Sequence, residues 1–346
     1  MKKRDKMRIC GSYCLCMLIM IIALISGCAT SAVHVSRSFE PSDAKEREFP
    51  GFTAVIAKKG DTLSSLAGQY LKDPSMEWLI ADFNGISSVN PGMEIIIPMK
   101  PYEMGGLTYR GYQTVPVLSY HNFSLDKTDK MTVSKRSFEE QMQLLKDRGY
   151  RVISLDQLFD FFDFKKQIPS KSVVITIDDG WKSAYEIAFP VLKKYGYPVT
   201  LFVYTDLINS TRKTMTWEQV KELSDNGIDI QCHTITHRDL AGAQEKESFK
   251  DYFDAIEKEI VQSSNIIKKN TGRDCRYLAY PYGGSSNMVV AILKRRTGFR
   301  GAFTVRRGSS PFFINNYMVN RSMIYGEYDL KKFEKVLTVF DDGAIK

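Results

Sequence analysis

The stretch SVVITIDDGW, residues 172–181, runs from an apolar segment directly into two carboxylates and a glycine. The β-branched residues of Ser172–Ile177 are typical of a buried strand. Asp178 and Asp179 repel each other and are costly inside such a strand, so they mark its end. The pair is explained either by a plain turn, which Asp and Gly favour, or by a chemical role at the tip of the strand.

Apolar segments of this kind alternate with helical patterns from about residue 115 to about residue 340. The strand-like segments are VPVLSYH, RVIS, SVVITI, PVTLFVY, IDIQC, RYLAY, GAFTV and RSMIY. This alternation predicts an α/β domain over residues 113–342, with a parallel sheet covered by helices and either open or closed into a barrel. In parallel α/β folds the functional site lies at the carboxyl ends of the strands.

Polar and turn-forming residues follow four of the predicted strands at that end. They are His121, Asp178, Asp179, His233, His237 and the turn Pro281–Gly283. Taken singly, a strand-ending histidine is often a structural group, and a His-x-x-x-His pair can lie on a surface. Together they favour a metal site, because two imidazoles and one carboxylate commonly bind an ion and leave positions for water and substrate. One Asp would then be a ligand, and its neighbour would stay ionised and accept a proton.

Three motifs carry a resemblance to a known family. TIDDG (residues 176–180), HTITH (233–237) and RYLAYPYG (276–283) resemble, in this order, the motifs of the polysaccharide deacetylases, carbohydrate esterase family 4. The resemblance implies a distorted (β/α) barrel. It also implies a hydrolase of linear amides that removes acetyl groups from N-acetylated sugars in peptidoglycan, chitin or poly-N-acetylglucosamine.

The same resemblance implies roles for individual residues. Asp178 is expected to be the general base, and Asp179, His233 and His237 are expected to hold a divalent metal, with zinc the expected ion. The metal would activate a water and polarise the acetyl carbonyl. In the third motif, Arg276 is expected to hold Asp178 in place, and the backbone N–H of Tyr282 is expected to stabilise the oxyanion. These six residues form the expected catalytic centre.

The chain departs from the family pattern in its late motifs. Common members supply a histidine from a late L-x-H motif as general acid, and a D-x-x-D-W motif supports the site, whereas here no histidine follows His237. Either His121 protonates the leaving amine, or Asp178 returns the proton itself, or the enzyme is impaired. The SYH strand end and the YPYG motif are similar to the branch that modifies exported poly-N-acetylglucosamine, which puts His121 in the expected site.

Residues 51–99 form a separate small unit with a predicted β-α-α-β order. The segments KKGDTLSSLAGQY, LIADFNG and VNPGMEIIIP resemble a LysM module. The resemblance implies binding to N-acetylglucosamine polymers such as peptidoglycan and chitin. The alternative is a small packing domain without a ligand.

The N-terminus indicates export. A basic segment, MKKRDKMR, precedes the apolar run CLCMLIMIIAL (residues 14–24), which is short for a membrane span. The following ISGC resembles a bacterial lipoprotein signal, so residues 1–27 are expected to be removed and Cys28 to carry lipid. The alternative is an uncleaved helical anchor. Residues 28–50 are polar and aperiodic and are expected to tether the folded part to the cell membrane or outer membrane, facing the periplasm or the exterior.

Charge and cysteine usage complete the sequence-based account. The formal net charge is +8, of which residues 1–27 carry +4, so the remainder has too mild a charge to indicate nucleic-acid binding. Cys232 and Cys275 are the two cysteines that remain after Cys28, and they form either a disulfide or two buried thiols.

The expected protein is a lipid-anchored, metal-dependent polysaccharide de-N-acetylase. The rival functions are a catalytically impaired glycan-binding lipoprotein and an O-acetyl esterase on the same metal site.

Overall fold

The computed structural model describes residues 46–100 and 104–343. The expected signal segment, Cys28 and most of the expected tether therefore lie outside the described residues. Within the described ranges, no helix has both the length and the apolar character that a membrane crossing requires.

The first part of the described chain is a small antiparallel sheet with two short helices. Strand β2 is central, with β1 and β3 on either side. The expected β-α-α-β order is present, and β1 is an addition, because it forms from residues expected to belong to the tether. Asn84 joins helix to sheet, since its side chain donates to the carbonyl of Ile96 and accepts from the N–H of Ile96. The elements are β1 (Glu46–Phe49), β2 (Phe52–Ile56), α2 (Leu63–Leu66), η1 (Ala67–Leu71), η2 (Pro74–Met76), α3 (Glu77–Asn84) and β3 (Glu94–Pro98).

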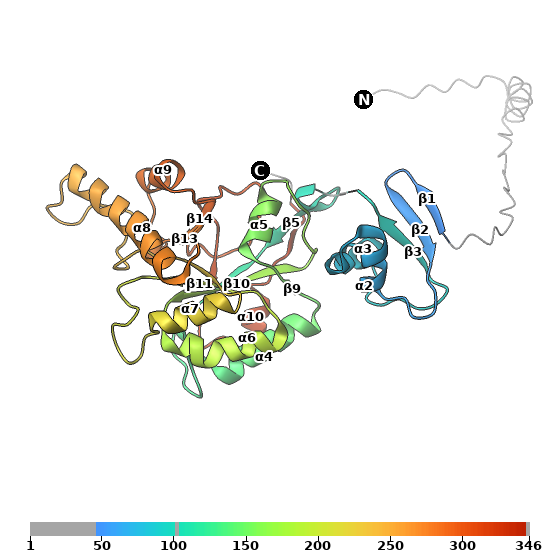
Figure 1. The fold of residues 1–346 in the computed structure, drawn as a ribbon, viewed down its shortest axis with the longest axis horizontal. Coiled ribbons are helices and arrows are strands. Elements are labelled where there is room, and N and C mark those ends of the chain that lie inside the picture. The colour runs from blue at the N-terminus through green and yellow to red at the C-terminus, as the bar shows by residue number, and fades with distance from the viewer. Residues whose placement is uncertain (1–45, 101–103, 344–346) are drawn as a thin grey trace, which may run out of the picture. The chain divides into compact units, whose positions relative to one another are not determined.

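The second part is built on a curled, parallel half-barrel sheet, so the expected fold class is confirmed (Figure 1). The strand order is β14-β13-β12-β11-β10-β6-β16, with β9 pairing to the start of β10. The strands are β6 (Val117–Tyr120), β9 (Arg151–Val152), β10 (Ser172–Asp179), β11 (Thr200–Val203), β12 (Asp229–Cys232), β13 (Tyr277–Ala279), β14 (Gly301–Phe303) and β16 (Ser322–Met323).

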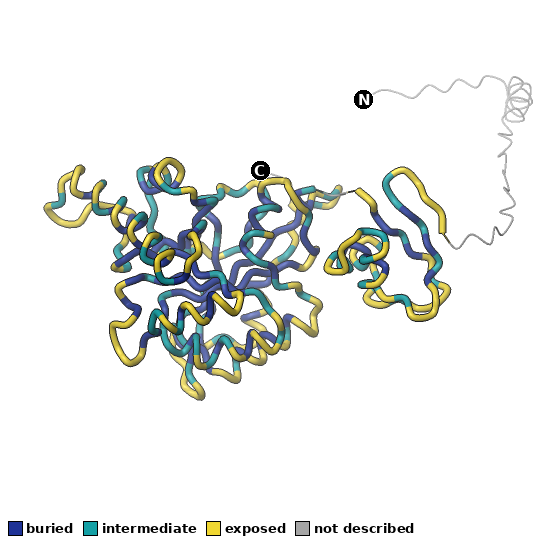
Figure 2. The backbone as a smooth tube through the Cα atoms, viewed as in Figure 1, coloured by how far each residue is buried: buried dark blue, intermediate teal, exposed yellow. Residues whose placement is uncertain are grey.

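Helices cover this sheet and bury it, as the dark strands in Figure 2 show. One apolar cluster joins the outer face of the sheet to most of the helices, and a second lies on the inner face, where α5 packs. The helices are α4 (Lys135–Asp147), α5 (Leu155–Phe162), η4 (Ala184–Ala188), α6 (Phe189–Tyr195), α7 (Trp217–Asp225), α8 (Phe249–Thr271), η5 (Pro281–Gly283), α9 (Asn287–Arg296) and α10 (Leu330–Glu334).

Short strands complete the domain. Strands β4, β5, β15 and β17 form a small antiparallel sheet, while β7 and β8 pair in parallel. The pattern of residues 330–340 predicts a helix, but α10 ends at Glu334 and Phe340 pairs with Gln113 in a strand instead. The remaining elements are η3 (Met104–Gly106), β4 (Leu107–Thr108), β5 (Gly111–Val115), β7 (Asn122–Ser124), β8 (Thr132–Ser134), β15 (Ser310–Pro311) and β17 (Phe340–Asp341).

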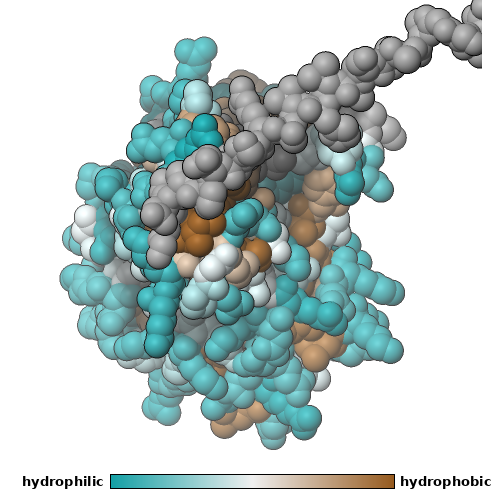
Figure 3. Space-filling model, turned by 90° about the vertical axis from the view of Figure 1, so that its right-hand side faces the viewer, coloured by the Kyte–Doolittle hydropathy of each residue, from teal (hydrophilic) through white to brown (hydrophobic). Residues whose placement is uncertain are grey.

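The surface carries isolated apolar side chains. Figure 3 shows one face of the molecule, on which hydrophilic residues predominate and hydrophobic residues form small separate groups. Tyr109, Leu125, Phe249 and Tyr282 are the most exposed large apolar side chains among the described residues. Because scattered residues of this kind are normal on soluble proteins, they do not indicate an interface by themselves.

The two cysteines left open by the sequence are free and buried. Burial raises the pKa of the Cys232 thiol to about 11, and its Sγ lies 3.3 Å from Ser263 Oγ on α8. The thiols therefore belong to the core of the domain rather than to a disulfide.

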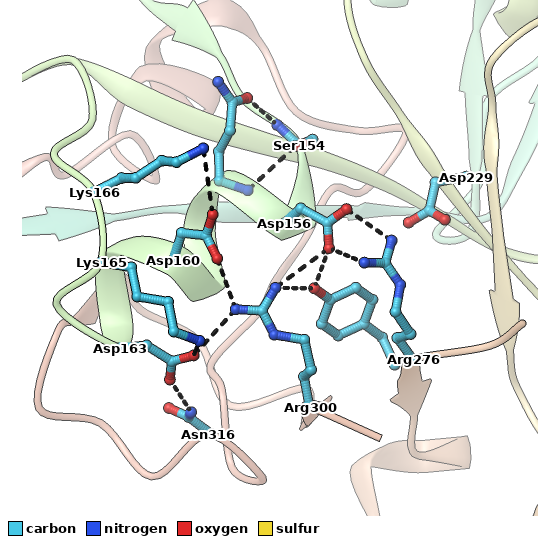
Figure 4. A network of polar contacts seen from close by, with 12 residues as sticks. Ser154, Asp156, Asp160, Asp163, Lys165, Lys166, Asp229, Arg276, Arg300 and Asn316 are labelled. Carbon is cyan, nitrogen blue, oxygen red and sulfur yellow. Dashed lines mark hydrogen bonds and ion pairs between the residues drawn. The ribbon is translucent and has the colours of Figure 1, made fainter. Parts of the chain in front are cut away.

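A network of ion pairs joins α5 to the starts of β13 and β14 (Figure 4). Arg276 Nη2 donates to Asp156 Oδ2 at 2.7 Å, and the Tyr277 hydroxyl donates to Asp156 Oδ1 at 2.7 Å. Arg300 Nη2 donates a hydrogen bond to Asp160 Oδ1 at 2.9 Å. Because these strands begin here, the network lies at the amino ends of the sheet, opposite the edge where a functional site is expected. It anchors α5 to the sheet.

Candidate active site and metal centre

The parallel register brings the expected site residues to one edge of the sheet. Strand β10 pairs with β6 and β11, and β11 pairs with β12, in each case up to the last residue of a strand. The side chains that end or follow these strands therefore meet at the carboxyl edge. They are His121, Asp178, Asp179 and His233.

Asp179, His233 and His237 form a compact cluster of potential metal ligands. The Nε2 atoms of His233 and His237 each lie 3.7 Å from Asp179 Oδ1. One ligand atom from each of the three residues lies within 4.8 Å of the others. Two imidazole nitrogens and one carboxylate oxygen at this spacing fit a divalent ion and leave coordination positions open on the exposed side.

The two histidines are prepared to act as neutral ligands. His233 Nδ1 lies 2.7 Å from the carbonyl oxygen of Ala279, which orients the ring so that Nε2 faces Asp179. Burial lowers the pKa of His233 to about 4 and outweighs the opposing charges of Asp178 and Asp179. Burial also lowers the pKa of His237. Both rings are therefore unprotonated at neutral pH, which is the form that binds a metal.

Helix α8 holds the loop that carries the two histidines. Glu259 is buried on α8, and its Oε2 accepts the backbone N–H groups of Ile235 at 2.8 Å and Thr236 at 3.0 Å. Ser263, one turn further along the helix, donates to the carbonyl of Thr234 at 2.9 Å. The loop between the two histidines is thus fixed by buried polar contacts from Glu259 and Ser263, neither of which was predicted from the sequence.

Asp178 is the second carboxylate, and it points to the inside of the sheet. It lies on the same, inner face of β10 as Val174 and Thr176, where Arg321 is fully buried. Arg321 Nη1 and Nη2 donate to Asp178 Oδ1 and Oδ2, each at 2.7 Å. Burial alone raises the pKa of Asp178, but attraction to Arg321 and to the nearby histidines outweighs it and lowers the pKa to about 2. Asp178 is therefore ionised at neutral pH although it is buried.

The expected pairing of Asp178 with Arg276 is wrong. Arg276 contacts Asp156 at the opposite end of the sheet, and Arg321 holds Asp178 instead. The physical reason is that Arg276 precedes β13 and Pro281 follows it, so the length of the strand separates them. Arg321 comes from the irregular segment before β16 and was not identified from the sequence.

His121 and Tyr282 lie at the rim of the same site. His121 Nε2 is 3.9 Å from Asp178 Oδ2. Tyr282 is 70% exposed, and its ring centroid is 4.7 Å from that of His237 in an edge-on arrangement. Of the residues expected in the catalytic centre, all except Arg276 are therefore gathered at this edge.

Four non-glycine residues at the site have positive φ angles. They are Asp179 (80°), Thr234 (74°), His237 (63°) and Tyr282 (57°). Such conformations cost free energy and persist when surrounding contacts fix them, and they concentrate at functional sites. Their clustering here indicates that these loops hold strained backbone conformations that place the side chains of the site.

Comparison with known proteins agrees with this geometry. The model of the polysaccharide deacetylase family matches residues 165–301, and that of the LysM domain matches residues 55–98. The chain carries a polysaccharide deacetylase domain and a LysM domain. The match to the deacetylase domain contains Asp178, Asp179, His233 and His237, whereas His121 and Arg321 lie outside it.

Individual relatives of this chain are themselves named as deacetylases. The chain is 28% identical over 207 residues to a putative polysaccharide deacetylase, YxkH, of Bacillus subtilis, covering 60% of this chain and 70% of the relative. It is 29% identical over 215 residues to the poly-beta-1,6-N-acetyl-D-glucosamine N-deacetylase of Staphylococcus epidermidis, covering 61% of this chain and 72% of the relative.

Solved structures of deacetylases are also similar to this chain in fold. The Streptococcus pyogenes deacetylase PplD in complex with acetate has a TM-score of 0.58 at 25% identity, covering 65% of this chain and 98% of that one. IcaB from Ammonifex degensii has a TM-score of 0.57 at 25% identity, covering 66% and 99%.

Proposed function

We propose that this protein is a metal-dependent hydrolase that removes N-acetyl groups from N-acetylglucosamine-containing polysaccharide, either peptidoglycan or poly-N-acetylglucosamine, at the cell envelope. The polysaccharide deacetylase domain makes it an amide hydrolase. The named activity of the Staphylococcus epidermidis relative supports the choice of an N-acetylglucosamine polymer. The LysM domain supports the same class of ligand.

One observation carries the proposal. A buried, ionised carboxylate, Asp178, stands directly beside a cluster of one carboxylate and two neutral imidazoles. The guanidinium of Arg321 helps keep Asp178 ionised in a place where burial alone would raise the pKa of that carboxyl. A charged base next to an open metal site is the arrangement that hydrolysis by an activated water requires.

The metal would be held by Asp179, His233 and His237, and zinc suits this mixed nitrogen and oxygen set. When bound, the ion supplies Lewis-acid activation of a water and of the acetyl carbonyl. The cluster is partly open, since the side chains of Asp179 and His237 are 14% and 22% exposed.

The chain's own residues would carry the proton transfers. Asp178 removes a proton from the attacking water, and Arg321 fixes the carboxylate in the orientation that this step needs. His121, whose Nε2 lies 3.9 Å from Asp178 Oδ2, would protonate the leaving amine. The backbone N–H of Tyr282 would stabilise the oxyanion.

The other parts of the chain would keep the enzyme at its polymer. Lipid on Cys28 would hold it at the cell membrane or outer membrane, with residues 29–45 as a tether. The LysM domain would bind the glycan and raise the local concentration of deacetylase domain on it.

A substrate panel with metal depletion tests this function. Purified protein is stripped with a chelator, reloaded with zinc, and supplied with peptidoglycan, with oligomers of β-1,6-linked N-acetylglucosamine, and with an O-acetylated sugar. We expect acetate release from an N-acetylated polymer after reloading and at least a hundredfold less after stripping, because the ion supplies the activated water.

The panel also separates the rival functions. Acetate released from the O-acetylated sugar alone would identify an esterase. Absence of acetate from every substrate after reloading, together with retained binding to peptidoglycan, would identify a glycan-binding lipoprotein without catalysis.

A further inference from the structure

Trp181 contacts the metal-ligand carboxylate on the side away from the histidines. Its indole Nε1 donates to Asp179 Oδ2 at 2.9 Å. The other oxygen of that carboxylate, Oδ1, is the atom that lies 3.7 Å from both histidine Nε2 atoms. The indole N–H therefore engages one oxygen and leaves the other directed into the metal cluster.

The backbone on both sides of Trp181 is fixed by the connection between β11 and α7. The N–H of Lys182 donates to the carbonyl of Lys213 at 2.9 Å, and the N–H of Met215 donates to the carbonyl of Gly180 at 3.0 Å. Between these two bonds, Trp181 itself forms a bridge with Thr214. The main-chain pairing thus fixes the backbone from which the Trp181 side chain projects.

Gly180 makes this close pairing possible. Its φ angle is 119°, which disfavours other residues, and an added Cβ would lie 2.6 Å from Cδ1 of Ile208 in the same connection. A side chain at position 180 would therefore be strained by the φ angle and would have to displace the end of the Ile208 side chain. Asp179, with its own positive φ angle, directly precedes Gly180.

We propose that Trp181 is a positioning residue for the metal: its indole N–H fixes the carboxylate of Asp179 so that Oδ1 alone faces the ion, and this sets the affinity of the site. The inference rests on the proposed metal site. Hydrogen-bond partners of metal ligands orient the ligand, and their loss typically costs 10–100-fold in metal affinity. An aromatic side chain that served only packing would not have this effect.

The test compares Trp181→Phe with Trp217→Phe in the full-length protein in detergent. Both variants exchange an indole for a phenyl ring, and Trp217 begins α7 at the far end of the same connection. The zinc dissociation constant is measured by competition with a chromophoric chelator. We expect Trp181→Phe to bind zinc about 10–100-fold more weakly and Trp217→Phe to bind it within about twofold of the unaltered protein, as a residue without contact to a ligand would.

Excess zinc supplies a second readout. Because Trp181→Phe leaves Asp178 and all three ligands in place, saturating zinc is expected to restore most of its acetate release, whereas a defect in the chemistry itself would persist. Equal zinc affinity of Trp181→Phe and the unaltered protein would overturn the inference while leaving the proposed function intact. Failure of the unaltered protein to bind zinc or another divalent ion would refute the proposed metal site itself.

A measurement on the unaltered protein covers the case in which Trp181→Phe does not fold. The chain has three tryptophans, so its ¹⁵N spectrum contains three indole N–H signals, and Trp78→Phe and Trp217→Phe assign the third to Trp181 by elimination. One equivalent of zinc is expected to shift the Trp181 signal and leave that of Trp217 in place. An unmoved Trp181 signal at saturating zinc would contradict the proposal.

Discussion

Replacement of Asp178 by asparagine is expected to lower kcat for acetate release by about 10²–10⁴-fold while zinc binding is retained. Asparagine has nearly the same shape but cannot accept a proton from water at neutral pH. The ligand cluster of Asp179, His233 and His237 is left in place, so the zinc dissociation constant should change little. Acetate release and zinc affinity are measured on the same preparation.

Asp156→Asn is the matched control. Asp156 also pairs with an arginine, Arg276, but at the opposite end of the sheet, so the same chemical change is made far from the site. We expect this variant to retain acetate release within about twofold, since it touches no group at the carboxyl edge. If Asp178→Asn kept more than a tenth of the unaltered kcat, a role for Asp178 as general base would be excluded.

Replacement of Arg321 by methionine is expected to lower the free energy of unfolding by about 3–5 kcal/mol, because a buried carboxylate then loses its partner. Arg321 is 0% exposed and bonds both oxygens of Asp178. Arg276→Met is the control. The side chain of Arg276 is 42% exposed, so its pair is screened by solvent, and we expect a loss of about 1 kcal/mol or less. Urea denaturation measures both variants.

A double variant separates the ion pair from simple loss of packing. In Asp178→Asn/Arg321→Met neither charge is left unpaired, so the double variant should be more stable than the sum of the single losses predicts. Strict additivity of the two losses would contradict a direct interaction between Asp178 and Arg321.

The effect of pH on stability follows from the same pair. The pKa of Asp178 is about 2, below the ordinary value of about 3.9 for an aspartate. The pair therefore contributes stability above about pH 4 and loses it as the pH falls toward 2. The difference in stability between the unaltered protein and Arg321→Met should shrink over that range.

The fold and the centre of the site were predictable because they depend on local patterns. Alternation of apolar strands and helices gave the parallel sheet, and helix α5 occupies Leu155–Phe162 as its pattern indicates. In a parallel sheet, the carboxyl ends of the strands lie at one edge, whatever conformation the loops adopt. For this reason Asp178, His233 and His121 could be placed together although they are distant in the chain.

The supporting residues were harder to predict, and for different reasons. Arg321 is 143 positions from Asp178 and lies in an irregular segment, so no spacing links the two. Arg276 was misplaced because it belongs to the third motif, within which strand β13 carries it to the other end of the sheet. Glu259 did leave a signal, since it interrupts the apolar stripe of α8 between Ile256 and Ile260. A carboxylate on a buried helix face needs partners, and here they are backbone N–H groups of the histidine loop.

One cation is expected to join Asp179, His233 and His237, and anomalous diffraction from zinc-loaded crystals locates it. We expect a single strong peak at the zinc absorption edge, between Asp179 Oδ1 and the Nε2 atoms of His233 and His237. A map without a peak at this position, or with zinc bound to other residues alone, would refute the metal centre.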